Sequence, residues 1–185
     1  MIFLLGVLAG LVAAMVLWRT VSGLAHVDFQ WPWLVPLGLG LQVLMFSSAW
    51  SLVPYGETLW HGSYVMSMVA VGIFCAANWR VPGIPLLGLG LLLNGVAILA
   101  NGGAMPASMQ ALRMAGLAST PEEVAASIAS NSVVITSDTP LWFLGDIWCI
   151  PASLPFSNVF SLGDITLGLG GAWFVFMNAA PTARA

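Results

Sequence analysis

Uninterrupted apolar runs, separated by short polar turns, dominate the sequence. Each run is at least 17 residues long, and Asp164 is the only formally charged residue inside any of them. A stretch of about 17–25 apolar residues is long enough to cross a bilayer as an α-helix. The pattern therefore predicts an all-α integral membrane protein, a single domain over residues 1–185 with about five transmembrane helices, at residues 2–18, 31–53, 60–79, 84–100 and 159–180.

The polar segment at residues 101–158 is predicted to be an outer loop with a helical hairpin. Residues 106–115 suit a helix that stops at Gly116, a common residue after a helix end. A second helix is expected to start at Thr120 as N-cap, with Pro121 in its first turn and Glu123 reaching back to form a capping box. The apolar residues expected to face the membrane or the other helices are Met109, Leu112, Val124 and Ile128.

Residues 141–150 are also apolar, but the run is only half the length of a span. Ten helical residues cover about 15 Å, against roughly 30 Å of hydrocarbon. We therefore expect a half-inserted segment that does not cross the bilayer.

The composition favours the same class of protein. Hydrophobic residues make up 59% of the chain and charged residues only 6%, whereas a soluble domain carries about 25% charged residues. Arg19, Arg80 and Arg184 follow the first, third and fifth runs, which places them on one side of a five-helix bundle. The positive-inside rule makes that side cytoplasmic. The sequence thus predicts a bacterial inner-membrane protein with its N-terminus outside and its C-terminus inside.

Charge and ligand content limit the partners. The net charge is −3 and no basic cluster is present, which argues against binding to nucleic acid. Glu57 and His61 are two metal-ligand types without a third, so no metal or other cofactor is expected. Membrane lipid is the expected partner, and the sequence leaves the oligomeric state open.

Two aspartates lie in apolar surroundings near the same predicted membrane face. Asp146 falls in the half-span, and Asp164 lies about one turn into the last run, 18 residues later (164 − 146 = 18). Ionisable groups at membrane depth are costly and are functional hypotheses by default. Two carboxyl groups brought close cannot both ionise cheaply, so they share a proton and provide one acid and one base. Such a pair can activate water against an amide or ester bond.

The residues around these aspartates resemble a known family. Phe160-Ser161-Leu162-Gly163-Asp164 looks like the Phe-Asn-x-Ala-Asp motif of the lipoprotein signal peptidases, which are intramembrane aspartyl proteases, with Ser161 in place of the motif's Asn. In that family a second catalytic Asp lies a little under twenty residues upstream, as Asp146 does here, and Asn94 resembles an Asn near the end of an earlier helix. The resemblance implies that Asp146 and Asp164 are catalytic and that the substrate is a membrane protein or lipopeptide. The supporting polar residues are Asn94, Asn101, Asn158 and Ser161.

A second resemblance covers the last half of the chain. Three segments, at residues 101–106, 141–146 and 158–164, are similar to an uncharacterised family of bacterial multi-pass membrane proteins. This resemblance implies no activity.

Other roles for the aspartates stay open. Each follows a glycine, and Asp164 lies in the first turn of its predicted helix, where a carboxylate interacts favourably with the helix dipole. Both can therefore be helix-capping residues, or part of a proton or cation relay. The sequence favours an aspartate-dyad hydrolase, or a degenerate relative of one. The alternative is a non-catalytic membrane subunit or scaffold that packs against a partner.

Overall fold

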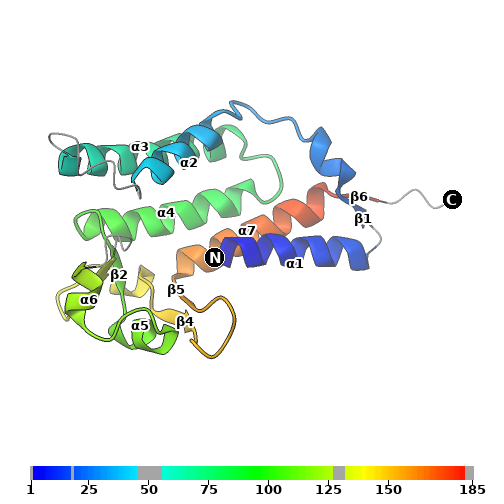
Figure 1. The fold of residues 1–185 in the computed structure, drawn as a ribbon. Helices are drawn as coiled ribbons and strands as arrows, with labels where there is room; N and C mark the ends of the chain where they lie inside the picture. The colour runs from blue at the N-terminus through cyan, green and yellow to red at the C-terminus, as the bar shows by residue number, and fades with distance from the viewer. Residues whose placement is uncertain (1, 18, 46–55, 127–131, 182–185) are drawn as a thin grey trace.

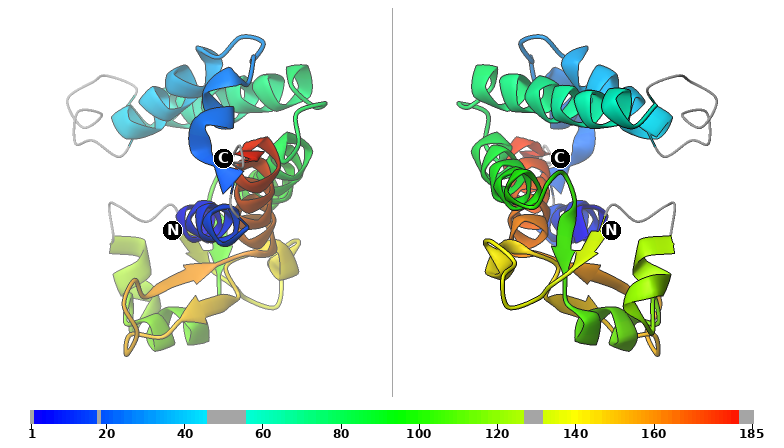
Figure 2. Two further views of the ribbon diagram at one scale, coloured as in Figure 1. Left: turned by 90° about the vertical axis from the view of Figure 1, so that its right-hand side faces the viewer. Right: turned by 90° about the vertical axis from the view of Figure 1, so that its left-hand side faces the viewer.

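The computed structural model describes the chain except residues 1, 18, 46–55, 127–131 and 182–185. Five longer helices form two stacked layers, and short strands and helices gather beneath one end (Figures 1 and 2). In the central layer α7 packs against both α1 and α4, while in the upper layer α3 packs against α2 and also against α4. The bounds of these helices are α1 Ile2–Val16, α2 Leu34–Met45, α3 Gly56–Ala77, α4 Ile84–Ala100 and α7 Leu162–Asn178.

Glycines bring the helices of the central layer close together. A Cβ at Gly10 of α1 would lie 2.6 Å from the carbonyl oxygen of Ala172 in α7, and one at Gly6 would overlap the backbone of Gly168. The spacing of Gly6 and Gly10 is the small-residue pattern that lets two helix backbones approach. Helix α1 therefore packs on α7 through its glycine face.

Two short strands pair at the C-terminal end of α7. Strand β1 (Arg19–Thr20) pairs antiparallel with β6 (Ala180–Pro181), and the 3-10 helix η1 (Val21–His26) follows β1. The Arg19 guanidinium donates to the carbonyl oxygen of Ala179 at 2.9 Å through Nε. A cation at this position stabilises the negative end of the helix dipole of α7.

The short elements connect α4 to α7 (Figure 1). Strand β2 pairs parallel with β3, and β4 pairs antiparallel with β5. The described residues of this region also form two short helices and one 3-10 turn. The bounds are β2 Met105–Ala107, α5 Met109–Ala115, α6 Pro121–Ala126, β3 Ser132–Val134, η3 Trp142–Leu144, β4 Trp148–Ile150 and β5 Asn158–Phe160.

The predicted helical hairpin is present. Helix α5 ends at Gly116, whose φ of 70° is the left-handed conformation that favours glycine. Helix α6 begins at Pro121, and the Glu123 backbone N–H donates to the Thr120 hydroxyl at 3.3 Å. The Glu123 carboxylate accepts from the Ser119 N–H at 2.6 Å, one residue before the predicted N-cap partner. Leu112 and Val124 are buried in one cluster against which Met109 packs, while Ile128 lies outside the described residues.

The prediction of an all-α membrane protein with five transmembrane helices is wrong. Among the residues that the structure describes, no helix combines the length and apolar character needed to cross a membrane. Helix α1 has 15 residues, and α4 and α7 have 17 each, which is at or below the lower limit of about 17 residues for a spanning helix. The predicted inner-membrane location and the N-out, C-in orientation are corrected by the same finding.

The prediction of a half-inserted helical segment at residues 141–150 is wrong as well. The segment contains the three-residue turn η3, a break at Gly145 and Asp146, and then strand β4. Leu141 adopts a left-handed conformation with φ of 50°, which prevents a longer helix from starting there. The aromatic and β-branched residues of β4 pair with β5, and such residues favour strands.

Candidate functional site

Asp164 and Ser161 form the N-terminal cap of α7. The Asp164 backbone N–H donates to the Ser161 hydroxyl at 3.0 Å, and the Ser161 N–H donates to Oδ2 of Asp164 at 3.1 Å. The Ser-x-x-acid spacing of residues 161–164 is the sequence of a capping box, here with Asp in place of the usual Glu. Asp164 therefore has the capping role that was one interpretation of the sequence.

Asn94 of α4 extends this cap into a ring of hydrogen bonds. Its Nδ2 donates to Oδ1 of Asp164 at 2.9 Å, and its Oδ1 accepts from the Ser161 hydroxyl at 2.7 Å. Ser161 has no exposed surface, so the ring is shielded from water on that side. Two segments 67–70 residues apart in the chain are held together by these bonds.

Two glycines make room for Asn94. A Cβ at Gly163 would overlap the Asn94 Oδ1, and a Cβ at Gly90 would lie 2.6 Å from the Gly163 carbonyl oxygen. Any larger residue at either position would separate α4 from the start of α7. The ring therefore depends on the backbones of α4 and α7 being in direct contact.

The backbone of Asp146 is fixed by strand β2. The Asp146 N–H donates to the Pro106 carbonyl oxygen at 2.7 Å, and the Asp146 carbonyl oxygen accepts from the Ser108 N–H at 3.0 Å. Gly145 lies so close to Pro106 that a Cβ would overlap the Pro106 carbonyl oxygen. Asp146 is not in a helix, so helix capping does not account for it.

The β4–β5 pair places the two aspartates at the same end of the site. The register pairs Trp148 with Phe160 and Ile150 with Asn158. Because the strands are antiparallel, the residues just before β4, which include Asp146, lie at the same end as the residues just after β5. The residue just after β5 is Ser161, and Asp164 follows three residues later in the first turn of α7.

The surroundings of Asp146 change its acidity. Burial raises the pKa of the Asp146 carboxyl group from its ordinary value of 3.8 to about 7, and the negative charge of Asp164 contributes to that pKa shift in the same direction. Desolvation and a nearby like charge both disfavour the ionised form. Near neutral pH a substantial fraction of the Asp146 carboxyl groups is therefore protonated.

Two predicted supporting residues lie outside this network. Asn101 follows α4, and its Nδ2 donates to the carbonyl oxygens of Ala97 at 2.8 Å and Pro140 at 2.9 Å, which ties the end of α4 to the segment before η3. Asn158 lies in β5 opposite Ile150. Of the six predicted site residues, hydrogen bonds bring together Asn94, Ser161 and Asp164, and the charge of Asp164 also acts on Asp146.

The sequence interpretation missed the glycines as site residues. Gly145 and Gly163 each precede an aspartate, a signal that was noted only as a capping feature. Gly90 lies one helical turn before Asn94 on the same face of α4. Each of the three permits a close backbone contact that positions a polar group of the site.

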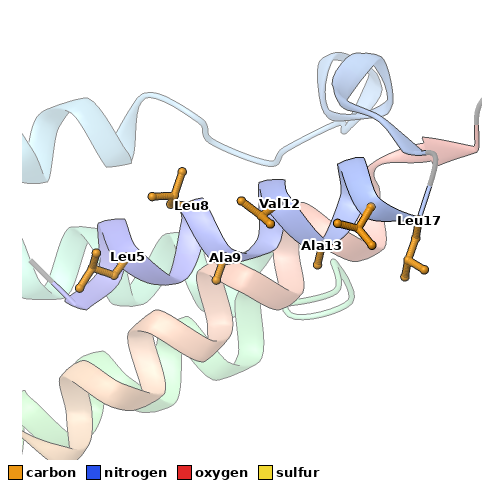
Figure 3. Close-up of a pocket in the computed structure, with 7 residues that line it drawn as sticks. Leu5, Leu8, Ala9, Val12, Ala13 and Leu17 are labelled. Atoms are coloured by element: carbon orange, nitrogen blue, oxygen red, sulfur yellow. The ribbon is translucent and has the colours of Figure 1, made fainter.

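Two apolar grooves lie elsewhere on the protein. One, of about 590 Å³, runs along α1 and is lined only by apolar side chains of residues 5–17, including Leu5, Val12 and Leu17 (Figure 3). The other, of about 450 Å³, lies between α3 and α4. Neither is lined by Asp146 or Asp164, so neither contributes a carboxyl group for chemistry.

Comparison with known proteins gives a family but no activity. Residues 26–176 match a family of unknown function, DUF5317. An uncharacterised protein of Thermotoga maritima is 28% identical over 144 residues, which cover 77% of this chain and 76% of that protein. No solved structure matches the chain. The predicted resemblance to an uncharacterised bacterial family is confirmed, whereas these comparisons provide no match to a signal peptidase.

Proposed function

We propose that this chain, which belongs to DUF5317, a family of unknown function, is a hydrolase that uses Asp146 and Asp164 as an acid–base pair. One carboxyl group accepts a proton from the attacking water, and the other supplies a proton to the leaving group. Amide and ester bonds are the substrates that such a pair can cleave without a covalent intermediate. The similarity of residues 160–164 to the aspartate motif of lipoprotein signal peptidases supports the same chemistry.

The observation that carries the proposal is the difference between the surroundings of the two carboxyl groups. Both oxygens of Asp164 accept hydrogen bonds, from Asn94 and Ser161, whereas burial and the charge of Asp164 raise the pKa of Asp146 to about 7. Pairs of titratable groups whose environments separate their acidities are typical of acid–base sites. A carboxyl group that titrates near neutral pH can act as the acid at physiological pH.

The test is hydrolysis by the purified protein and its Asp146→Asn and Asp164→Asn variants. The probes are a pool of fluorescence-quenched peptides and a set of 4-nitrophenyl esters. We expect each variant to lose at least about 100-fold in turnover, because Asn can neither accept nor supply the proton in the reaction. Asp138→Asn is the matched control, since Asp138 is exposed in a loop, and it should keep full activity.

Two results would contradict the proposal. One is wild-type protein, folded and pure, that cleaves none of the probes. The other is hydrolysis that survives in both Asn variants, which would assign the activity to another site or to a contaminant. Either result would leave the non-catalytic alternative as the better interpretation.

A further inference from the structure

The groove between α3 and α4 is lined by neither aspartate and is open to a ligand. Its volume is about 450 Å³, within the usual range of small-molecule sites. Five of the apolar side chains along it are between 40% and 61% exposed, those of Val65, Val69, Leu92, Val96 and Leu99. A ligand can therefore enter this groove from the surface.

Glycines keep the groove open. A Cβ at Gly72 of α3 would meet nothing within 4 Å, so this position faces empty space. On α4, a Cβ at Gly88 would meet only the side chain of Cys75, and one at Gly95 would meet only the end of Met68. The walls at these positions are thus formed by side chains and open space, whereas the glycines between α4 and α7 meet backbone atoms.

The lining favours a hydrocarbon chain. None of the described residues that line the groove is charged, and burial raises the pKa of the Cys75 thiol, which keeps it neutral. Such a lining stabilises apolar groups and penalises a buried charge. The lining residues of α4 extend from Ile84 to Leu99, which is about 22 Å along the helix axis. An extended acyl chain fits this length better than a compact ring does.

A cation lies in the turn that closes one end of the groove. Ala76 of α3 and Ile84 of α4 line that end, and Arg80 is exposed in the turn between them. The Arg80 guanidinium lies 5.3 Å from the centroid of the Trp79 ring, and it forms no hydrogen bond or ion pair with the described residues. Its donors are therefore available to an anionic group.

The backbone places Trp79 on the groove side of this turn. The Asn78 N–H donates to the Phe74 carbonyl oxygen at 3.1 Å, so the helical hydrogen-bonding pattern continues one residue past the end of α3. Trp79 then follows Gly72 and Ala76 at the spacing of one helix face. The exposed ring and the guanidinium over it thus continue the apolar lining to a positive charge.

The groove along α1 does not offer the same combination. Arg19 is the cation nearest in sequence to its Leu17 end. The Arg19 guanidinium donates to the carbonyl oxygens of Ala179 and Met177 and lies over the Phe176 ring. These contacts occupy it within the protein, so the groove between α3 and α4 is the better site for an amphiphilic anion.

We propose that the groove between α3 and α4 binds a long-chain fatty acid. The hydrocarbon chain lies between the two helices, and the carboxylate accepts hydrogen bonds from Arg80. A guanidinium can donate two parallel hydrogen bonds to a carboxylate, and one cation matches the single charge of a fatty acid. This binding is independent of the proposed hydrolase activity.

The experiment is binding of cis-parinaric acid, a fluorescent fatty acid, to the delipidated protein, with competition by palmitate, laurate and lauryl alcohol. Palmitate should compete better than laurate, because each further methylene that is buried contributes about fourfold in affinity. Arg80→Gln should weaken binding of both acids about fivefold, the upper end of what an exposed ion pair contributes, and leave lauryl alcohol unchanged. Arg113→Gln, in α5 and outside the groove, is the matched control and should change none of the affinities.

A second variant blocks the groove itself. In Gly72→Leu the side chain enters the open space, and the fold should be kept because leucine favours a helix more than glycine does. Loss of room for several methylenes should lower the affinity for palmitate and for lauryl alcohol at least about tenfold. Gly40→Leu in α2 is the matched control, since a Cβ at Gly40 also meets nothing within 4 Å but the residue does not line the groove.

Three results would overturn the inference. Equal palmitate affinity in wild type and folded Gly72→Leu would place the fatty acid elsewhere on the protein. An equal effect of Arg80→Gln on laurate and on lauryl alcohol would show that the carboxylate does not lie at Arg80. Ligand-free wild-type protein that sediments as a dimer, with Gly72→Leu as a monomer, would assign the groove to a second copy of the chain.

Discussion

Gly163→Ala is expected to lower the free energy of unfolding by about 3 kcal/mol. The added methyl group would overlap the Asn94 Oδ1 and lie 2.8 Å from the Gly90 carbonyl oxygen. Neither group is at the end of a flexible chain, so α4 and α7 must move apart. Overpacking of this kind costs about 1–3 kcal/mol, and loss of the ring leaves buried polar groups of Asn94 and Ser161 without partners at about 1–3 kcal/mol more. Urea unfolding of the purified variant measures the change.

Gly72→Ala is the matched control for this prediction. Gly72 also lies within a helix, but a Cβ there would meet nothing within 4 Å. Replacing a helix-interior glycine by alanine at an open position should raise stability by about 0.5–1 kcal/mol. If Gly163→Ala were as stable as wild type, the close approach of Asn94 to the start of α7 would not exist in solution.

Stability is expected to fall as pH rises from about 4 to about 7. The pKa of Asp146 is about 7 in the folded protein against an ordinary value of 3.8, so the folded state binds this proton more tightly than the unfolded chain. The unfolded chain releases the proton first as pH rises, and the folded state is progressively destabilised until Asp146 itself ionises near pH 7. At 1.36 kcal/mol per pKa unit, the shift corresponds to at most about 4 kcal/mol.

The measurement is urea unfolding of wild type and Asp146→Asn at intervals between pH 4 and pH 8. The asparagine side chain of this variant stays neutral at every pH, so the stability difference between the variant and wild type should grow in favour of the variant up to about pH 7 and then level off. Asp138→Asn, at an exposed loop position, should follow the wild-type curve. Parallel curves for wild type and Asp146→Asn would show that Asp146 has an ordinary acidity.

The positions of the helices were largely predictable from the apolar runs, but their ends were not. The run at 84–100 corresponds to α4 residue for residue. The run at 159–180 contains the end of β5, the cap Ser161 and the start of β6, which leaves only Leu162–Asn178 as helix. Apolar residues are compatible with a helix or a strand, so run length overstates helix length. The membrane prediction failed because the lengths of the apolar runs were taken as the lengths of the helices.

The strands were missed for a related reason. The three-residue strands β2, β3, β4 and β5 are too short to show an alternating pattern. Their pairing depends on contacts between residues distant in sequence, such as Pro106 with Val133. The segment at 141–150 was thus interpreted as a short helix from its composition, although its backbone forms a turn followed by a strand.

Much of the candidate site was predictable because its chemistry is local in the sequence. The Ser161-x-x-Asp164 spacing is a recognisable capping box, and an aspartate in an apolar segment is an unusual residue that singles out Asp146. The ring through Asn94 depends on helix packing across 70 residues, and its geometry cannot be read from spacing. The glycines are the sequence signal for that packing, since each of Gly90 and Gly163 marks a contact that no side chain fits.

The central claim is that the Asp146 carboxyl group, whose pKa is raised to about 7, is protonated in the folded protein at pH values where an ordinary aspartate is ionised. Infrared spectroscopy of protein labelled with ¹³C-carboxyl aspartate tests it most directly, because a protonated carboxyl group has a C=O stretch that a carboxylate lacks. We predict this band at pH 6 in wild type, its loss by pH 9, and its absence at pH 6 in Asp146→Asn. A wild-type spectrum at pH 6 with no protonated aspartate, or a band that persists in folded Asp146→Asn, would contradict the account.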